Sequence, residues 1–299
     1  MEDLHGRVAV VTGGGSGIGA ASARCLAAAG VAVVVADRDE PRAGAVAREI
    51  LAGGGQASPA RCDVTSVTDV AGLARDVLDA HGRVDIVMSN VGTLAVGSPL
   101  EIPLSEWERV IDVNLLSAVR INAVFLPLLL AQGEGHVVYT ASYNGLWSYS
   151  WDRLPYTATK AALVAMAEAL ALYLLPRGVG VTCLCPGPVA TNIAEQTRRF
   201  GERARLARPA LDLLDPAVVG AQVVDAIRAG TWLALTHHEM SAEMVARARD
   251  PEAFLRRHLS VEDDVEAGRS LHHEEADPLV GEPGGEAHVP DALDHGLER

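Results

Sequence analysis

The chain has 299 residues, a mass of 31.4 kDa and 49% hydrophobic residues, which suits one large α/β domain with a tail. Its formal net charge of −14 argues against binding to nucleic acid or to anionic membranes, since both need basic surfaces. The N-terminal residues lack the features of a signal peptide, and no segment gives about 18 uninterrupted apolar residues, so we expect a cytoplasmic protein without a membrane span.

From residue 7, short β-branched runs alternate with longer Ala- and Leu-rich stretches. The runs predict strands at 7–12, 31–37, 57–64, 84–90, 136–142, 179–187 and 231–236. The stretches predict a helix that ends near residue 30 and further helices over about 40–52, 66–81, 106–132 and 156–176. The strands are continuous apolar runs, as in strands covered by helices on both faces. This order predicts an α/β fold, a single doubly wound Rossmann domain over 1–240 with a parallel sheet of about seven strands.

Beyond this domain we expect a helical extension over 241–260 and an acidic tail over 261–299. The tail holds twelve Asp or Glu and two Arg, with few large apolar residues, which predicts disorder. The pairs His237-His238 and His272-His273 lack a third ligand at metal spacing, so they are interpreted as solvated surface and no metal site is expected. The four cysteines show no paired spacing and are expected to be reduced thiols.

A glycine-rich turn, VVTGGGSGIGAASA, follows the first predicted strand and opens a helix. Glycine lets the backbone approach a pyrophosphate closely, and a helix N-terminus offers free N–H groups to it. Glycine clusters also occur in ordinary turns that need positive φ, so the strand-to-helix context carries the weight. The residues expected at the phosphates are Gly13, Ser16, Gly17, Ile18 and Gly19.

Asp37 ends the second predicted strand, eighteen residues after Gly19, near the spacing at which a carboxylate meets the adenosine ribose of a dinucleotide. A carboxylate there accepts hydrogen bonds from both ribose hydroxyls and repels a 2′-phosphate, which favours NAD over NADP. Arg38 is the competing signal, because a guanidinium can pair with that phosphate. A solvated turn aspartate is the alternative interpretation of Asp37.

Lys160 is the only lysine in the chain, and it stands four residues after Tyr156 in the stretch YTATK. At helical spacing the two side chains share one face and can serve one site. Tyrosine, with a pKa of about 10, is a poor base at neutral pH, and a nearby ammonium would lower that pKa. The pair therefore predicts a general acid/base, and the lysine can also donate to the ribose of a nicotinamide cofactor.

With these residues the chain resembles the short-chain dehydrogenase/reductase family, whose signature combines T-G-x-x-x-G-x-G with Y-x-x-x-K. Here the two motifs are Thr12 to Gly19 and Tyr156 to Lys160. Further family marks follow in order at Asp63-Val64, Asn90, Asn114, Ser142 and Pro186-Gly187, and the resemblance covers about residues 5–240.

The resemblance implies a role for each matching residue. Tyr156 would be the acid/base, Lys160 its pKa partner and ribose ligand, and Ser142 a donor to the substrate oxygen. Asn114 would hold a water that links Lys160 to solvent. The remaining residues would line the cofactor: Asp63 and Val64 beside the adenine, Asn90 and Gly92 at its middle, and Pro186, Gly187, Val189 and Thr191 on the nicotinamide side. The structural alternatives are a strand-end cap for Ser142 and a helix-distorting residue for Asn114.

The chain departs from the family at SNVG (89–92), where N-N-A-G is usual, and in a slightly longer loop between Ser142 and Tyr156. That loop is aromatic, which suggests a pocket for a flat or bulky apolar alcohol with Trp147 and Tyr149 as contacts. Packing against another subunit or the C-terminal segment is the alternative. A local likeness of 178–199 and 231–240 to aryl-alcohol Cα-dehydrogenases favours an aromatic or cyclic secondary alcohol, and we expect residues 192–206 to form a mobile flap over it.

The sequence thus predicts an NAD-dependent dehydrogenase of a bulky, aromatic or cyclic secondary alcohol. It would have no nucleic-acid or membrane partner and would form a homodimer or homotetramer, as family members do. An NADP-dependent ketone reductase is the nearest competing hypothesis, and a cofactor-binding protein without turnover is another. The intact set of Asn114, Ser142, Tyr156 and Lys160 argues against the latter.

Overall fold

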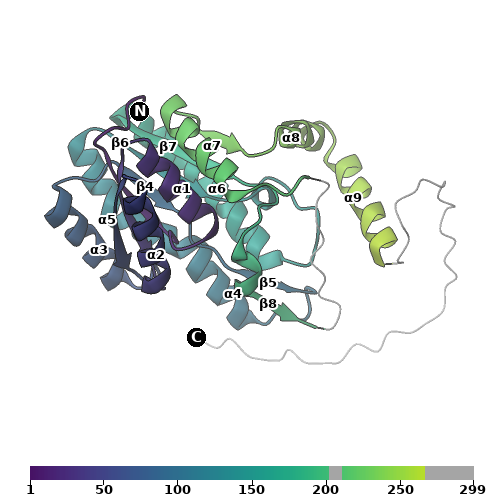
Figure 1. Ribbon diagram of the computed structural model, residues 1–299. Helices are drawn as coiled ribbons and strands as arrows, with labels where there is room; N and C mark the ends of the chain where they lie inside the picture. The colour runs from purple at the N-terminus through teal and green to yellow at the C-terminus, as the bar shows by residue number, and fades with distance from the viewer. Residues whose placement is uncertain (202–210, 267–299) are drawn as a thin grey trace, which may run out of the picture. The chain divides into compact units, whose positions relative to one another are not determined.

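Seven parallel strands form the central sheet of the computed structural model, which describes residues 1–201 and 211–266 (Figure 1). In sheet order they are β3 (Gln56–Arg61), β2 (Ala32–Asp37), β1 (Val8–Thr12), β4 (Ile86–Ser89), β6 (Gly135–Thr140), β7 (Val179–Cys185) and β9 (Leu233–Leu235). The order reverses between β1 and β4, as in a doubly wound sheet. The predicted Rossmann fold is confirmed, with a last strand shorter than expected.

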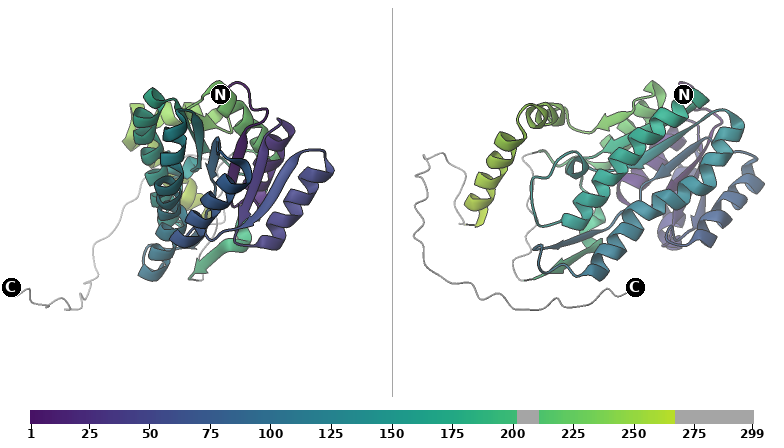
Figure 2. Two further views of the ribbon diagram at one scale, coloured as in Figure 1. Left: turned by 90° about the vertical axis from the view of Figure 1, so that its left-hand side faces the viewer. Right: turned by 180° about the vertical axis from the view of Figure 1, so that it is seen from behind.

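Helices cover both faces of this sheet (Figures 1 and 2). One face carries α1 (Gly17–Ala28), α2 (Glu40–Ala52) and α7 (Pro216–Ala229). The other carries α3 (Val67–His81), α5 (Ser117–Gln132) and α6 (Leu154–Leu174). Successive side chains of a strand point to opposite faces, so both faces need apolar residues. In β1, Val8 and Val10 belong to the apolar core on the side of α3, α5 and α6, whereas Ala9 and Val11 belong to the core on the side of α1 and α2.

The long helix predicted over 106–132 is interrupted in its first half. Between α4 (Leu104–Ile111) and α5 lies a π-helical segment, Asp112–Leu116, with Asn114 in its middle. A π-helical turn inserts an extra residue into an α-helix and is frequent at functional sites. The structural alternative for Asn114, that it distorts its helix, is therefore seen in the structure.

The stretches Leu104–Gln132 and Leu154–Arg177 are long and apolar enough to span a membrane by length and composition, with mean hydropathies of 1.8 and 1.6. Here both belong to the helical layer of the domain, because α5 packs against β4 and β6 while α6 packs against β7. Only 33% of each apolar window is buried within this chain, so a broad apolar face is left outward.

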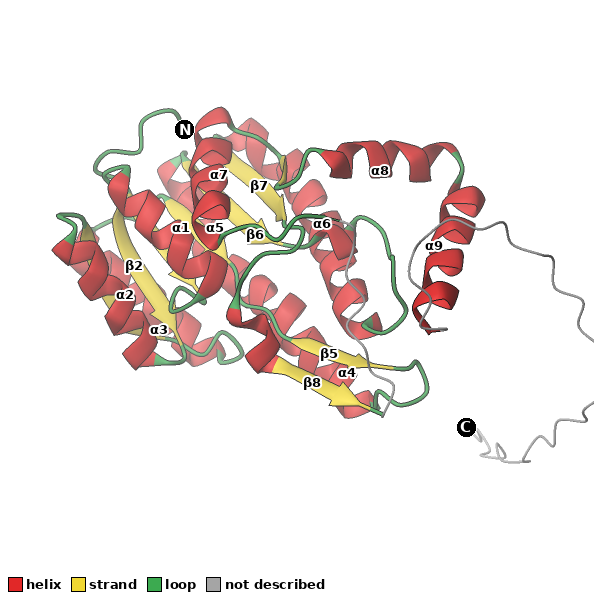
Figure 3. Ribbon diagram, turned by 45° about the vertical axis from the view of Figure 1, so that its right-hand side comes forward, coloured by secondary structure: helices red, strands yellow, loops and turns green. Residues whose placement is uncertain are grey.

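A separate two-stranded parallel sheet joins β5 (Leu94–Gly97) to β8 (Thr197–Phe200) (Figure 3). The sequence pattern does not predict this sheet. Each strand has only four residues, and although the first reads LAVG, the second reads TRRF and gives no apolar run. The sheet holds the first half of the expected flap in place, and we call Asn192–Phe200 the flap from here on. The expected flap residues from 202 to 206 lie outside the described residues.

After β9 the chain forms α8 (Glu239–Arg249) and α9 (Pro251–Glu266). The helical region therefore begins before 241 and continues past 260, into the part assigned from sequence to the acidic tail. The rest of that tail, 267–299, lies outside the described residues.

A buried carboxylate joins the N-terminal ends of β1 and β4. Asp85 is 0% exposed and accepts hydrogen bonds from the Val8 N–H (2.9 Å), Arg7 Nη1 (2.9 Å) and Arg83 Nε (2.9 Å). The Glu134 carboxylate accepts hydrogen bonds from the same two arginines, from Arg7 at 2.7 Å and from Arg83 at 2.8 Å. This cluster lies at the end of the sheet opposite to the glycine turn.

Candidate active site

The candidate site lies where the sheet order reverses. β1 and β4 are neighbours there, and the glycine turn follows the first while Asn90 follows the second. In doubly wound sheets this crevice, outside the carboxyl ends of the strands, holds the ligand. Asn90 ties its walls together, because its Nδ2 donates to the Gly13 carbonyl oxygen (3.3 Å) and its Oδ1 accepts from Thr140 Oγ1 (3.0 Å).

The glycine turn has the shape that a phosphate cradle requires. Gly13 and Gly17 have φ values of +62° and +53°, which residues with side chains rarely adopt. A Cβ at Gly19 would collide with the Gly13 carbonyl oxygen. Ser16 precedes α1 without a side-chain capping bond, so the first N–H groups of the helix are left for a ligand. The turn from Gly13 through Ile18 to Gly19 therefore fits the pyrophosphate of a dinucleotide.

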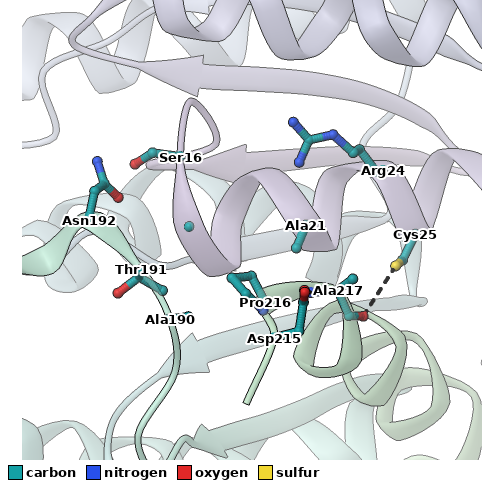
Figure 4. A pocket seen from close by; sticks show the side chains of 11 residues that line it. Ser16, Ala21, Arg24, Cys25, Ala190, Thr191, Asn192, Asp215, Pro216 and Ala217 are labelled. Carbon is teal, nitrogen blue, oxygen red and sulfur yellow. Dashed lines mark hydrogen bonds between the residues drawn. The ribbon is translucent and has the colours of Figure 1, made fainter. Parts of the chain in front are cut away.

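A pocket of about 410 Å³ opens beside this turn (Figure 4). It is lined from α1, the residues leading into the flap and the start of α7: Ser16, Gly17, Ala21, Arg24, Cys25, Ala190, Thr191, Asn192, Asp215, Pro216 and Ala217. Thr191 lies close to Gly17, because a Cβ added to Gly17 would come within 3.2 Å of the Thr191 side chain. Ser16 and Gly17 were predicted at the phosphates and Thr191 on the nicotinamide side of the cofactor. Arg24, Cys25 and Asp215 were not predicted, since only the packing of α1 on α7 brings them together.

Asp37 stands at the end of β2 beside the glycine turn. Its carboxylate accepts from the Gly15 N–H (3.0 Å) and the Asp39 N–H (3.0 Å). Each carboxylate oxygen has a further lone pair, so both can still accept a ribose hydroxyl. Arg38 is exposed next to it.

Asp63 and Val64 follow β3, the neighbour of β2. The Cys62 N–H donates to the Asp37 carbonyl oxygen (2.9 Å), which places this segment beside Asp37. Val64 is 5% exposed, and Asp63 Oδ1 accepts from the N–H and the hydroxyl of Thr65 (2.9 and 2.7 Å). The structure therefore groups both residues with Asp37, on the side of the crevice predicted for the adenosine.

Ser142, Tyr156 and Lys160 meet beside β6 and α6. Lys160 Nζ lies 5.6 Å from the centroid of the Tyr156 ring and donates to the Thr140 carbonyl oxygen (2.7 Å). Ser142, which follows β6, lies near enough to the Tyr156 hydroxyl to influence its pKa. Gly92 adjoins them, since a Cβ there would lie 3.4 Å from Lys160 Nζ. The structure thus brings together four residues that the motifs predicted.

Burial governs the ionisation of both groups. It raises the pKa of the Tyr156 hydroxyl, and the nearby Ser142 side chain offsets only part of the rise. It also lowers the pKa of Lys160 to about 8. The expected lowering of the Tyr156 pKa is therefore wrong for this arrangement. Both groups lose solvent, and the ammonium donates to Thr140 instead of the phenol.

The buried ammonium should make the stability of the protein depend on pH. The pKa of Lys160 is lowered from 10.5 to about 8 on folding, so between these values the unfolded chain binds more protons. The free energy of unfolding should rise by up to about 3 kcal/mol across this window, relative to a Lys160→Met variant that lacks the titration. Urea unfolding of both proteins at pH 8 and pH 10.5 measures this, and parallel pH dependences would show that the amine is solvated.

The Asn114 side chain is 1% exposed and fastens two parts of the site together. Its Oδ1 accepts from the Thr93 N–H (2.7 Å), while its Nδ2 donates to the Thr93 carbonyl oxygen (3.0 Å) and to Thr159 Oγ1 (3.1 Å). Thr159 directly precedes Lys160 on α6. Asn114 therefore braces the segment after β4 against the helix that carries the lysine, and its role in holding a water stays a prediction.

The segment after β7 forms another wall of the site. The Pro186 carbonyl oxygen accepts from the Tyr143 N–H (3.0 Å), and the Gly187 N–H donates to Thr236 Oγ1 (2.9 Å). Val189 then pairs with Leu214 in an isolated bridge.

A buried histidine supports this wall. A side chain on Gly187 would meet His237 Nδ1 at 2.5 Å. His237 is 6% exposed and bonds Thr236 Oγ1 and the Asp212 carbonyl oxygen, both at 2.9 Å. Its interpretation as solvated surface is therefore wrong, whereas His238 is exposed.

The aromatic loop before Tyr156 packs against the C-terminal helices. Trp147 is 6% exposed and meets the Phe254 ring of α9 edge-on at 6.5 Å, while Arg247 of α8 donates to the Leu146 carbonyl oxygen (2.9 Å). Tyr149, 8% exposed, stacks on Tyr143 at 5.0 Å. For Trp147 the structure therefore shows the alternative of packing against the C-terminal segment. Contact of Trp147 or Tyr149 with a substrate stays a prediction.

Comparisons with known proteins agree with this fold and site. The family model described as short chain dehydrogenase matches residues 7–201. The 1-deoxy-11-beta-hydroxypentalenate dehydrogenase of Streptomyces exfoliatus is 38% identical over 195 residues, which cover 64% of this chain and 70% of that protein.

Solved structures are similar over more of the chain. A short chain dehydrogenase/reductase from Burkholderia phymatum in complex with NAD is 29% identical, with a TM-score of 0.75, and covers 92% of this chain and 100% of its own. A metagenomic short-chain oxidoreductase in complex with NADP is 32% identical, with a TM-score of 0.65, and covers 78% of this chain and 96% of its own. Because the family model spans most of the chain and the fold recurs in these relatives, the protein belongs to the short-chain dehydrogenase/reductase family of oxidoreductases.

Proposed function

We propose that this oxidoreductase is an NAD-dependent dehydrogenase of a secondary alcohol, bulky and aromatic or cyclic. The observation that carries the proposal is that Ser142, Tyr156 and Lys160 lie together beside the crevice that the glycine turn opens, with Lys160 Nζ 5.6 Å from the centroid of the Tyr156 ring. The Streptomyces exfoliatus relative supports it, because that protein is named as the dehydrogenase of a hydroxypentalenate.

The residues of the site supply the proton chemistry of this reaction. In oxidation, Ser142 donates to the substrate oxygen and Tyr156, as phenolate, takes the hydroxyl proton. A nicotinamide bound in the crevice supplies the acceptor for the hydride that leaves the carbinol carbon. Lys160 Nζ lies 5.6 Å from the centroid of the Tyr156 ring, so its protonated amine would place a positive charge near the phenolate and offset part of the cost of its burial. In ketone reduction Tyr156 returns its proton to the carbonyl oxygen.

Further residues would hold the cofactor. The backbone from Gly13 to Gly19 would take the pyrophosphate, and Asp37 the adenosine ribose. Asp63, Val64, Asn90 and Gly92 would line its adenine and middle. Pro186, Gly187, Val189 and Thr191 would lie on the nicotinamide side. NAD or NADP is the cofactor class of the family relatives, and the choice between them rests on Asp37 and Arg38.

Replacing Asp37 with serine should move the cofactor preference towards NADPH. The carboxylate repels a 2′-phosphate, and its removal leaves the exposed Arg38 to pair with that phosphate. We expect the ratio of NADPH to NADH affinity to rise by about tenfold or more, measured by fluorescence titration of both nucleotides. Arg38→Ser is the matched variant and should shift the ratio the other way. Tighter NADPH binding by the wild type would instead favour the NADP-dependent ketone reductase.

We also propose that the protein forms a homodimer or homotetramer through α5 and α6. Both helices present large apolar side chains to solvent, with Val119 46% and Leu172 79% exposed. An exposed apolar face of this kind is typical of an interface between subunits.

A further inference from the structure

The flap and Asn114 are connected through one buried residue, Thr93. Asn114 holds the backbone of Thr93 at both its N–H (2.7 Å) and its carbonyl oxygen (3.0 Å). The Thr93 hydroxyl accepts from Arg109 Nη1 (2.8 Å) and donates to the carbonyl oxygen of Gln196 in the flap (3.2 Å). Thr93 is 4% exposed, so these groups take the place of water around it.

An ion-pair network holds the flap at the same point. Thr93 precedes β5, whose Leu94 pairs with Thr197 of β8. Glu106 on α4 accepts from Arg109 Nε (2.7 Å) and from Arg198 Nη1 of β8 (2.5 Å). Burial opposes the ionisation of Glu106, but the hydrogen bonds from the two arginines outweigh it and hold the pKa of Glu106 below its ordinary value. Arg109 therefore contacts both Thr93 and the carboxylate that holds the flap.

We propose that Thr93 is a positioning residue that couples the flap to Asn114, so that closure over the substrate and bracing of the lysine-bearing helix occur together. The proposal rests on the dehydrogenase function, in which Asn114 and Lys160 belong to the catalytic centre. A lifted flap would leave the Thr93 hydroxyl without an acceptor and Glu106 without Arg198 at buried positions, which is unfavourable. The closed arrangement of the flap is therefore the preferred one.

The variant Thr93→Val tests the link, because it removes the hydroxyl and keeps the backbone groups that Asn114 holds. Thr93→Ser is the matched control, since it keeps a hydroxyl. Hydrogen exchange of the β8 amides, followed by mass spectrometry without substrate, should accelerate by about tenfold in Thr93→Val and stay at the wild-type rate in Thr93→Ser. Amides of β1 serve as the internal reference for global stability. An unchanged β8 rate in Thr93→Val, or equal acceleration in both variants, would overturn the proposal.

Asn114→Ala tests the coupling from the other end, because coupling between two sites is reciprocal. None of the Asn114 side-chain bonds reaches β8, so faster β8 exchange at an unchanged β1 rate supports transmission through Thr93, and unchanged β8 exchange contradicts it. With an alcohol that the wild type oxidises, Thr93→Val should raise KM several-fold while kcat and its pH profile are retained. A normal KM would contradict the coupling. The exchange measurements need no substrate, so they decide the coupling independently of the dehydrogenase assignment.

Discussion

Replacing Tyr156 with phenylalanine should lower kcat by about 10²–10⁴-fold, the usual contribution of a positioned general acid or base, while NADH binding is nearly unchanged. The substitution removes the hydroxyl that we propose as the acid/base and keeps the ring beside Lys160. Steady-state kinetics and NADH fluorescence titration measure the two effects. Tyr173→Phe is the matched control, because Tyr173 lies on the same helix and is 49% exposed. Full activity of Tyr156→Phe would exclude the proposed mechanism.

The pH profile of the wild type gives an independent check on Tyr156. Burial raises the pKa of its hydroxyl, so the phenol is protonated at neutral pH. Alcohol oxidation needs the phenolate and should become faster as pH rises towards that pKa. Ketone reduction needs the phenol and should become slower over the same range. Profiles with the same slope in both directions would indicate another acid/base.

Replacing Asp85 with asparagine should lower the free energy of unfolding by about 1–3 kcal/mol, because it removes a buried carboxylate that serves the Val8 N–H and two partly exposed arginines. Asp85 is 0% exposed and serves Arg7, Arg83 and the Val8 N–H at once. Asp85 lies at the opposite end of the sheet from the crevice, so the folded variant should bind NADH with the affinity of the wild type. Urea unfolding and NADH titration measure the two quantities.

Glu134→Gln is the control for this experiment, since Glu134 bonds the same two arginines from a side chain that is 47% exposed. An exposed partner contributes about 0–1 kcal/mol. Equal losses in the two variants would mean that burial of Asp85 does not decide its contribution.

The sequence predicts those parts of the site whose residues lie within a few positions of one another in the chain. The glycine turn needs one strand and one helix, and Tyr156 with Lys160 needs a single helical turn, so local pattern suffices for both. The continuous burial of β1 likewise follows from its apolar run. These features require no knowledge of which distant segments meet.

Other features depend on contacts between distant segments and carry little local signal. β5 and β8 pair across about a hundred residues, and in β8 Arg198 contacts Glu106 while Phe200 packs against Ala95, Ile102 and Val110. His237 is polar in sequence yet buried, because the Asp212 carbonyl oxygen and Thr236 satisfy its ring nitrogens. Trp147 could face a substrate or a helix, and its packing against Phe254 of α9 depends on a contact over about a hundred residues that no local pattern encodes.

The burial of the single lysine has a practical consequence for labelling. Lys160 is the only side-chain amine of the chain and is 2% exposed, so acylating dyes have no accessible lysine in the folded protein. Unfolding frees this amine, and each opened chain then gains one lysine-linked fluorophore. The rate of dye incorporation at Lys160 would therefore count opening events directly, with no engineered cysteine and no background from other lysines.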